Sequence, residues 1–282
     1  MRALQGFGAA TPPVFAAAWQ DAAALDIAGI TADSRQVVPG DLFAAIPGTR
    51  SDGRAFIAEA VARGAVAVLA PDGTIWPDGV PSRPLLLDAE PRRRLAQIAA
   101  VIAGPQPETL VAVTGTNGKT SSVEFLRQIW ALGGHRAASL GTLGVIAPNF
   151  PPGPGLTTPD PVSLAEILAG LARVGVRSAA MEASSHGLHQ YRLDGVQLAA
   201  AGFTNLTRDH LDYHGTLDAY RRSKLRLFTD LLPAGAPAVA HADMDPATLD
   251  ALRTVAAERR LRLLTVGETG AHLRLLAVTP RP

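Results

Sequence analysis

The segment that most constrains the fold covers residues 110–125 and reads LVAVTGTNGKTSSVEF. A short apolar run, typical of a buried strand, precedes a glycine-containing loop, and a stretch with helical periodicity follows it. The usual phosphate-loop pattern is G-x-x-x-x-G-K-[ST], whereas the first glycine of this loop comes two positions late, at Gly115. Small residues still let backbone N–H groups converge on an anion, and the helix N-terminus adds its dipole. The order of strand, loop and helix therefore predicts a compact nucleotide-binding loop rather than a glycine turn with a surface lysine.

Composition narrows the class of protein. The 282 residues are 47% apolar, which is enough for about two domains with real cores. Lys plus Arg number 26 against 25 Asp plus Glu, a balance that indicates neither a nucleic-acid binder nor a polybasic membrane binder. There is no cysteine, and no stretch approaches the ~20 apolar residues of a membrane span. The first residues, MRALQGFGAATPPVF, lack the apolar core of a signal peptide. We expect a cytoplasmic monomer with no nucleic-acid and no membrane partner.

Short apolar runs alternate with helix-period stretches, which predicts an α/β fold with a mostly parallel sheet. The expected strands are 65–70, 85–87, 110–113, 175–181, 236–240 and 261–266, with the start of another at 273–278. The expected helices are 55–62, 92–102, 121–132, 160–171 and 246–259. Turns or loops are expected at 33–35, 39–43, 48–53 and 147–154. The Gly-Pro-Gln-Pro run at 104–107 suits neither helix nor central strand, so we place a boundary there between an N-terminal domain, 1–104, and a second domain, 105–282.

Polar side chains gather next to the expected strand ends. Lys119 and Thr120 end the phosphate loop, where a lysine can reach terminal phosphates and a hydroxyl can join a Mg²⁺ shell. Glu182 follows an expected strand, at the sheet edge where parallel sheets bind ligands, and its carboxylate suits Mg²⁺. A structural polar turn is the alternative for Glu182. Thr157 and Thr158 precede an expected helix, where hydroxyls suit an anionic ligand or serve as plain caps.

The segment FTNLTRDHLDYHG, residues 203–215, places two His and two Asp close together. One interpretation is a zinc site with His210 and His214 one helical turn apart. A third ligand is not obvious, however, and no H-E-x-x-H pattern is present. The alternative is an exposed charged loop, and we expect His186 and His189 to be solvated or structural.

Taken together and in this order, these segments resemble the Mur ligases, the ATP-dependent amide-forming enzymes of peptidoglycan precursor synthesis. TGTNGKTS looks like their ATP loop, which is shared with folylpolyglutamate synthases. LTTPD, MEASSHGLHQYR and FTNLTRDHLDYHG look like the member that adds the third residue of the stem peptide. DSRQVVPGDLFAAIPGTRSDG is similar to the UDP-binding domain of that member. The resemblance covers roughly residues 30–266.

The resemblance implies a role for each matching residue. The ATP phosphates would be held by Gly115, Thr116, Asn117, Gly118, Lys119, Thr120 and Ser121. One Mg²⁺ would bind Thr120 and Glu182. A second would bind His210 and Lys224, provided that carbamylation reverses the charge of Lys224; an ordinary helix lysine is the alternative. The muramoyl dipeptide would contact Thr157, Thr158, Ser184, Gln190 and Arg192. The uridine end would contact Ser34, Thr49, Arg50 and Ser51. The catalytic residues would be Lys119, Lys224 and His210.

The implied reaction uses ATP to convert the D-Glu carboxylate into an acyl phosphate, which the amine of meso-diaminopimelate or L-lysine then attacks. Bringing two anions together needs cations, which accounts for Lys119, Arg192 and two Mg²⁺ ions. The family's C-terminal domain, with its arginine-bearing specificity motif, and the last strands of its ATP-binding domain are not matched. Leu156 stands where the family often has a polar side chain. We therefore expect a C-terminally truncated chain without full activity. The alternatives are another Mur or folylpolyglutamate ligase, a non-catalytic nucleotide-sugar and ATP-binding fragment, and a zinc hydrolase.

Overall fold

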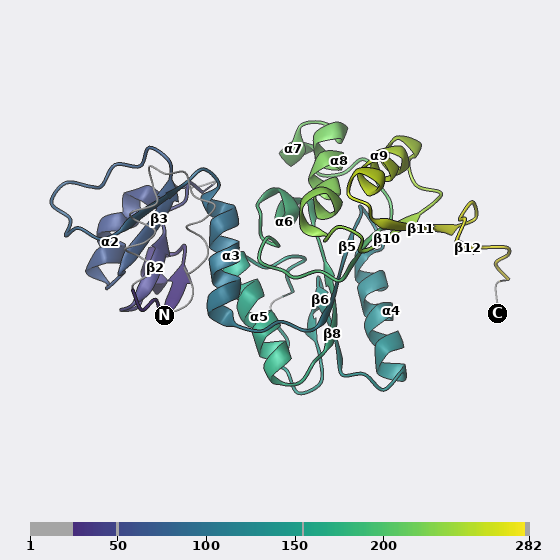
Figure 1. The fold of residues 1–282 in the computed structure, drawn as a ribbon, viewed down its shortest axis with the longest axis horizontal. Helices are drawn as coiled ribbons and strands as arrows, with labels where there is room; N and C mark the ends of the chain where they lie inside the picture. Colours follow the sequence, from purple (N-terminus) through teal and green to yellow (C-terminus); the bar gives the residue numbers. More distant parts are fainter. Residues whose placement is uncertain (1–24, 49–50, 154, 280–282) are drawn as a thin grey trace. The chain divides into compact units, whose positions relative to one another are not determined.

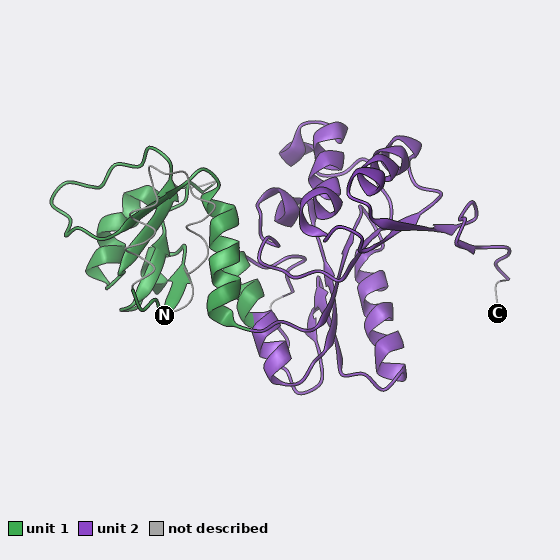
Figure 2. Cartoon of the chain, viewed as in Figure 1, with its two compact units in different colours: residues 1–104, 161–166 green, residues 105–160, 167–282 purple. Residues whose placement is uncertain are grey.

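The structure is a computed structural model that describes residues 25–48, 51–153 and 155–279 (Figure 1). Contacts within the chain divide it into two compact units (Figure 2). Unit 1 comprises residues 1–104 and 161–166, and unit 2 comprises residues 105–160 and 167–282. Each unit is built on a sheet of its own, and the expected α/β architecture with parallel sheets is confirmed.

Unit 1 contains a four-stranded parallel sheet in the order β1-β2-β3-β4. Its strands are β1 (Gly29–Thr31), β2 (Asp41–Ala44), β3 (Ala67–Pro71) and β4 (Leu85–Asp88). One face packs Leu42 and Leu69 beneath helix α3 (Pro91–Ala103). The other face packs Phe43 and Val68 beneath helix α2 (Ile57–Ala62). Because helices cover both faces, the strands are apolar on both sides.

The expected turn at 39–43 is wrong over its second half, because Asp41–Ala44 forms β2. Leu42, Phe43 and Ala44 have no exposed surface, so this apolar run is a buried central strand that happens to follow a Pro-Gly turn. The helix expected at 55–62 also starts differently. A 3₁₀ turn, η3 (Gly53–Phe56), comes first, and α2 follows it. A second 3₁₀ turn, η2 (Ser34–Gln36), lies in the expected turn region.

Unit 2 contains an eight-stranded sheet in the order β12-β11-β10-β9-β5-β8-β6-β7. All neighbouring strands pair in parallel except β6 and β7, which pair antiparallel. The strands are β5 (Thr109–Thr114), β6 (Ala137–Gly141), β7 (Gly144–Ile146), β8 (Ser178–Glu182), β9 (Ala200–Phe203), β10 (Pro237–His241), β11 (Arg262–Gly267) and β12 (Leu273–Arg274). Because β5 lies between β8 and β9, the loop after β5 is adjacent to the ends of both neighbours.

The helices of unit 2 connect these strands (Figure 1). They are α4 (Lys119–Leu132), α5 (Pro161–Arg173), α6 (Ser185–His189), α7 (Leu211–His214), α8 (Leu217–Arg226), the π-helical turn η4 (Leu227–Leu231) and α9 (Pro246–Glu258). The first part of α5, residues 161–166, belongs to unit 1. Helix α9 starts where the sequence predicts, since the Asp245 side chain accepts a hydrogen bond from the Thr248 N–H and Pro246 occupies the first turn.

One sequence expectation fails in unit 2, and three strands were not among the expected elements. The strand expected at 273–278 is reduced to two residues, because Leu276 and Val278 are exposed and lie in irregular chain. Strands β6, β7 and β9 were not anticipated, since small residues such as those of Ala137–Gly141 carry little strand signal although all five are buried.

Strand register shows that Val113, Gly202, Val239 and Leu264 share one face of the sheet. Helix α4 covers this face over β5 and packs on β6 and β8. Beyond β5 the same face is only half-buried at Val239 and Leu264.

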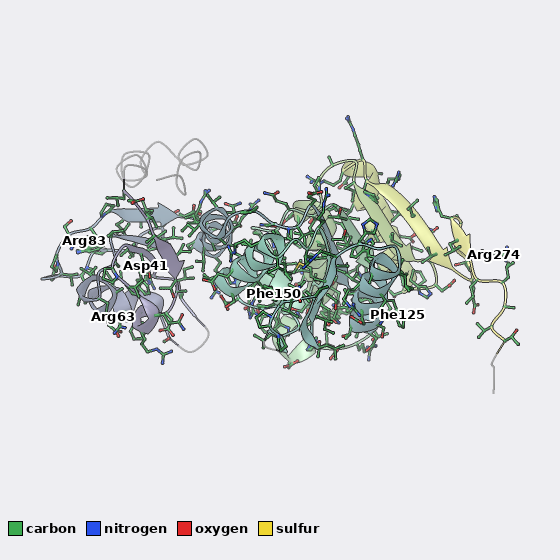
Figure 3. All side chains as sticks on the ribbon, turned by 90° about the horizontal axis from the view of Figure 1, so that it is seen from below. Asp41, Arg63, Arg83, Phe125, Phe150 and Arg274 are labelled. Atoms are coloured by element: carbon green, nitrogen blue, oxygen red, sulfur yellow. The ribbon has the colours of Figure 1, made fainter. Side chains whose placement is uncertain are left out.

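Phe125 of α4, 61% exposed, lies on the outer surface of the helix (Figure 3), and Ile129, one turn later, is 62% exposed. Unit 2 therefore presents apolar surface along α4.

Candidate functional site

The loop between β5 and α4 has the form predicted for a phosphate-binding loop. Gly115 and Gly118 have φ angles of 145° and 82°, which glycine adopts without strain. A Cβ atom at Gly115 would also collide with the Thr204 hydroxyl. Lys119 is the first residue of α4, so the first-turn N–H groups of the helix, which have no intrahelical acceptors, follow the loop directly. The local geometry can therefore bind an anion.

The Lys119 side chain folds back over the loop. Its Nζ donates hydrogen bonds to the carbonyl oxygens of Gly115, at 2.9 Å, and Thr116, at 2.8 Å. Burial lowers the pKa of Lys119, while the carboxylates of Glu182 and Asp209 act in the opposite direction. The Lys119 ammonium group is thus held at the loop by neutral carbonyl acceptors, which the oxygens of a phosphate group can replace.

The end of β9 supports the loop from the other side. The Asn205 side chain accepts from the Asn117 N–H at 3.0 Å and donates to the Asn117 carbonyl at 3.1 Å. The Thr204 hydroxyl donates to that carbonyl at 2.6 Å. Thr116 is also held here, because its N–H donates to the Asn205 carbonyl and its hydroxyl accepts from the Thr207 N–H. Sequence reasoning missed Thr204 and Asn205, although a polar pair directly after an apolar strand was a usable signal.

Glu182 is the last residue of β8 and is almost fully buried, with 1% exposure. Its Oε1 accepts from the Thr120 hydroxyl at 2.9 Å and from the Thr142 N–H at 2.8 Å. Gly141 is required beside it, because a Cβ there would overlap the Glu182 carboxyl group. The predicted pair of Thr120 and Glu182 is therefore in direct contact. Thr142, whose hydroxyl also donates to Glu182 at 3.4 Å, was missed because β6 was not anticipated.

Thr157 contacts Thr142, and Thr158 contacts the backbone of Glu182. The Thr157 and Thr142 hydroxyls are 3.3 Å apart. The buried Thr158 hydroxyl donates to the Glu182 carbonyl at 3.0 Å and accepts from the Ser184 N–H at 3.0 Å. The Ser184 hydroxyl caps α6 by accepting from the Gly187 N–H. These residues form a compact hydroxyl-rich group at the end of β8.

Arg192 lies beside the hydroxyl-rich group. One guanidinium nitrogen donates to the Thr158 carbonyl at 2.7 Å, and two others donate to the Gln190 side-chain oxygen at 3.2 and 2.7 Å. Gln190 also donates to the Tyr213 hydroxyl. The predicted pair of Gln190 and Arg192 therefore acts as one unit, in which Gln190 orients the cation.

Lys224 lies on α8 with only 1% exposure. Its Nζ donates to the Gly115 carbonyl at 2.7 Å and lies 4.5 Å from the centre of the Tyr220 ring. Burial, with a smaller contribution from Lys119, lowers the pKa of Lys224 to about 7, and Asp209 opposes this shift. A solvated helix lysine is excluded by this burial.

Four histidines and Tyr213 form an aromatic cluster next to these residues. The His186 ring lies 4.1 Å from Tyr213, 5.0 Å from His210 and 5.5 Å from His214, measured between ring centres. Burial is the main cause that lowers the pKa of His214 to about 4 and also lowers that of His186. Within residues 25–48, 51–153 and 155–279, no three His, Asp or Glu side chains are placed to hold a metal ion, so the zinc interpretation finds no support. His210 precedes α7 as its N-cap residue and has a φ of 52°.

A cavity of about 330 Å³ collects many of the predicted residues. Its cationic and imidazole lining consists of Lys119, His186, Arg192, His210 and Lys224. Its remaining lining consists of Leu156, Thr157, Thr158, Ser184 and Ser185. With two lysines and an arginine and no carboxylate in its lining, the cavity suits an anionic ligand.

The residues predicted for the uridine end belong to unit 1. Ser34 is buried and donates to the Glu59 carboxylate at 2.7 Å, whereas Ser51 is exposed. Thr49 and Arg50 lie outside the described residues. In the part of the chain that the structure describes, no helix is both long and apolar enough to cross a membrane.

Two family models match this chain. The Mur ligase middle domain matches residues 113–279, and a second model, described as Mur ligase family, catalytic domain, matches residues 26–103. The Rhizobium meliloti UDP-N-acetylmuramoyl-L-alanyl-D-glutamate–2,6-diaminopimelate ligase is 55% identical over 260 residues, which is 92% of this chain and 52% of the relative. The Caulobacter vibrioides protein of the same name is 53% identical, over 91% of this chain and 53% of its own. The chain thus spans about half the length of the curated relatives that it matches.

Solved structures agree with these matches. A structure of a UDP-N-acetylmuramoyl-L-alanyl-D-glutamate–2,6-diaminopimelate ligase superposes with a TM-score of 0.75 at 32% identity, over 88% of this chain and 50% of that one. The MurF ligase of Thermotoga maritima, solved with ADP, shares the fold with a TM-score of 0.54 at 24% identity, over 86% of this chain and 51% of that one. Because the middle-domain match alone covers more than half of its residues, the chain belongs to the Mur ligase family.

Proposed function

We propose that this chain carries the nucleotide-sugar-binding and ATP-binding parts of an ATP-dependent amide ligase. The ligase would add 2,6-diaminopimelate to UDP-N-acetylmuramoyl-L-alanyl-D-glutamate in peptidoglycan synthesis, as the names of the relatives describe for those proteins. The observation that supports this most is the cavity in which Lys119, Arg192 and Lys224 meet beside the phosphate loop. Two anions, ATP and a carboxylate, need such a concentration of positive charge to react.

Magnesium fits the residues at the loop. The Thr120 hydroxyl and the Glu182 carboxylate are in direct contact, and both are the hard oxygen donors that Mg²⁺ prefers. Nucleotide oxygens and water would complete the coordination shell, since Mg²⁺ is usually held by only one or two protein groups. Bound there, Mg²⁺ would neutralise phosphate charge and so reduce the repulsion between ATP and the incoming carboxylate.

The protein groups then have separate tasks. The loop N–H groups and the N-terminus of α4 would hold the phosphates, and Lys119 would exchange its two carbonyl partners for phosphate oxygens. Thr157, Ser184 and Arg192 would hold the D-Glu end of the dipeptide. The D-Glu carboxylate oxygen attacks the γ-phosphorus, ADP leaves, and the acyl phosphate that results is attacked by the amine, which expels inorganic phosphate. No covalent bond to the enzyme is required.

We propose in addition that Lys224 becomes carbamylated. With a pKa of about 7, a large fraction of this amine is neutral at physiological pH and can attack CO₂, forming an N–C bond and releasing one proton. The carbamate would replace a buried positive charge by a negative one. Together with His210, which lines the same cavity, it would provide donors for a second Mg²⁺.

Residues 1–104 would bind the UDP end of the substrate, through Ser34 and the segment of Thr49, Arg50 and Ser51, and residues 105–282 would bind ATP. We propose a cytoplasmic location, because a chain without cysteine fits a reducing compartment. The monomeric state stays a prediction, which sedimentation velocity would test.

Calorimetric titration of the purified chain tests the proposal. Mg·ADP and UDP-N-acetylmuramoyl dipeptide should each bind, and Lys119→Ala should weaken Mg·ADP binding only. A parallel assay would measure phosphate release from ATP with the dipeptide and diaminopimelate. Binding of both ligands supports the proposed function, and phosphate release that depends on all three substrates would add the amide-forming reaction to it. If neither ligand binds, the proposed function is wrong.

A further inference from the structure

Three consecutive carbonyl groups of the phosphate loop accept hydrogen bonds from side chains, of which Lys119 belongs to the loop itself and Thr204, Asn205 and Lys224 come from other parts of unit 2. The Gly115 carbonyl accepts from Lys119 and Lys224, and the Thr116 carbonyl accepts from Lys119. The Asn117 carbonyl accepts from the Thr204 hydroxyl and the Asn205 amide. None of these contacts is part of a helix or strand ladder. Lys119 would release its carbonyl partners to a phosphate, whereas Thr204 and Asn205 fix the orientation of the peptide group between Asn117 and Gly118.

The orientation of a carbonyl determines that of the next N–H. In a trans peptide the C=O and the N–H point in opposite directions, and no cis peptide bond occurs in the described residues. Because Thr204 and Asn205 hold the Asn117 carbonyl, the N–H of Gly118 must point away from them. The φ of 82° at Gly118, which glycine tolerates, then turns the chain into α4.

Asn205 contacts Asn117 on both of its backbone groups. Its Oδ1 accepts from the Asn117 N–H while its Nδ2 donates to the Asn117 carbonyl, so the Asn117 N–H is already used and is not available to a ligand. The backbone N–H groups that remain available to bind an anion are therefore that of Gly118 and those in the first turn of α4.

We propose that Thr204 and Asn205 are positioning residues that aim the Gly118 N–H at the nucleotide phosphates. This inference rests on the proposed function, since it requires that the loop binds a nucleotide. Without Asn205 and Thr204, the peptide between Asn117 and Gly118 can rotate and present its carbonyl oxygen to the phosphates instead. That oxygen repels an anion, so nucleotide binding weakens.

The experiment compares Mg·ADP affinities of four variants of the full chain by calorimetry. Asn205→Ala and Thr204→Ala each remove one of the two contacts to the Asn117 carbonyl, and each should weaken binding about 3-fold to 10-fold, as expected for the loss of a hydrogen bond while the other donor remains. Thr204→Ser keeps the hydroxyl and should bind like the wild type. Asn149→Gly changes an exposed asparagine with a φ of 57° and is the matched control, which should leave the affinity unchanged.

A second measurement separates positioning from a merely structural role. Amide-resolved hydrogen exchange should show that saturating Mg·ADP protects the Gly118 N–H in the wild type and in Thr204→Ser. In Asn205→Ala that protection should be lost, even at saturating nucleotide, while the amides of β8 stay protected. If Asn205→Ala does not fold, Asn205→Asp replaces it, because Asp keeps the acceptor for the Asn117 N–H but places an oxygen against the Asn117 carbonyl.

The outcomes are distinguishable. Weaker Mg·ADP binding together with lost Gly118 protection supports the positioning role. Wild-type affinity in both alanine variants overturns it and leaves the proposed function intact. Absence of Mg·ADP binding by the wild-type chain overturns both.

Discussion

At the scale of single residues, the buried amine of Lys224 should make the free energy of unfolding depend on pH. Its pKa of about 7 lies well below the ordinary 10.5 that the unfolded chain would show. Between these values the unfolded state binds more protons than the folded state, so the free energy of unfolding should rise with pH by up to about 1.4 kcal/mol per pH unit. Below pH 7 Lys224 is protonated in both states, so the burial of its positive charge lowers the free energy of unfolding by its full amount.

Urea unfolding of the wild type and of Lys224→Met, at pH 7 and pH 9 in CO₂-free buffer, would measure this effect. The methionine variant should lack the Lys224 contribution, so the two pH dependences should differ. Equal slopes for the two proteins would contradict the lowered pKa.

Replacing Glu182 should weaken the effect of Mg²⁺ on ADP binding. Glu182→Gln keeps the shape of the side chain but removes the charge next to the Thr120 hydroxyl. Changes next to a metal ligand cost 10-fold to 100-fold in affinity, so loss of a direct carboxylate ligand should cost at least about tenfold. We expect the gain in ADP affinity on adding Mg²⁺ to shrink by that factor, while ADP binding in EDTA stays near that of the wild type. An unchanged Mg²⁺ effect would show that Glu182 is not a ligand.

Sequence reasoning identified the residues of the site that carry chemical groups but missed the residues that support them. The motifs contained Lys119, Glu182 and Arg192, and the cavity brings Lys119 and Arg192 together. The supporting contacts of Thr142 and Asn205 join residues 40 and 88 positions apart in the chain. No local pattern encodes such a distance, because it depends on which strands are neighbours in the sheet.

At the scale of elements, a buried ion pair ties α8 to the segment after α6. Arg226 donates to both carboxylate oxygens of Asp194, whose side chain is 1% exposed, and to the Leu188 carbonyl. Asp194→Ala would leave the arginine without its main anionic partner, and it should lower the free energy of unfolding by about 3 kcal/mol. Asp250→Ala breaks an exposed pair with Arg253 and is the matched control, which should cost less than about 1 kcal/mol. Similar urea midpoints for the two variants would contradict this assignment.

Helices were easier to predict than strands. Helix α9 combines an Asp cap, a proline in its first turn and a periodic apolar face, and its start is correct. Strand β2 has four residues and follows Pro-Gly, a dipeptide that predicts a turn. Short buried strands carry no alternation, because both of their faces are covered, so their identity is decided by tertiary packing.

At the scale of the whole molecule, the apolar surface along α4 should bind a hydrophobic dye. Phe125 and Ile129 lie one turn apart and are each more than 60% exposed. The double variant Phe125→Gln, Ile129→Gln should lower the fluorescence of bound anilinonaphthalene sulfonate and leave the melting temperature nearly unchanged, since exposed substitutions cost little. Leu143→Gln changes an equally exposed apolar residue in the β6–β7 turn and should have a smaller effect on the dye. Equal losses would argue against a continuous surface on α4.

The path of the chain also has a consequence for synthesis. Unit 1 includes residues 161–166, and Ala165 is buried in its core with Leu95 and Ile98. A ribosome therefore makes β5, β6 and β7 before it supplies the last piece of unit 1. Strand β5 then remains without its neighbours β8 and β9, because these two strands are translated later still. The core of unit 1 is completed only after strands β5, β6 and β7 of unit 2 have been made, so the two units cannot mature strictly one after the other.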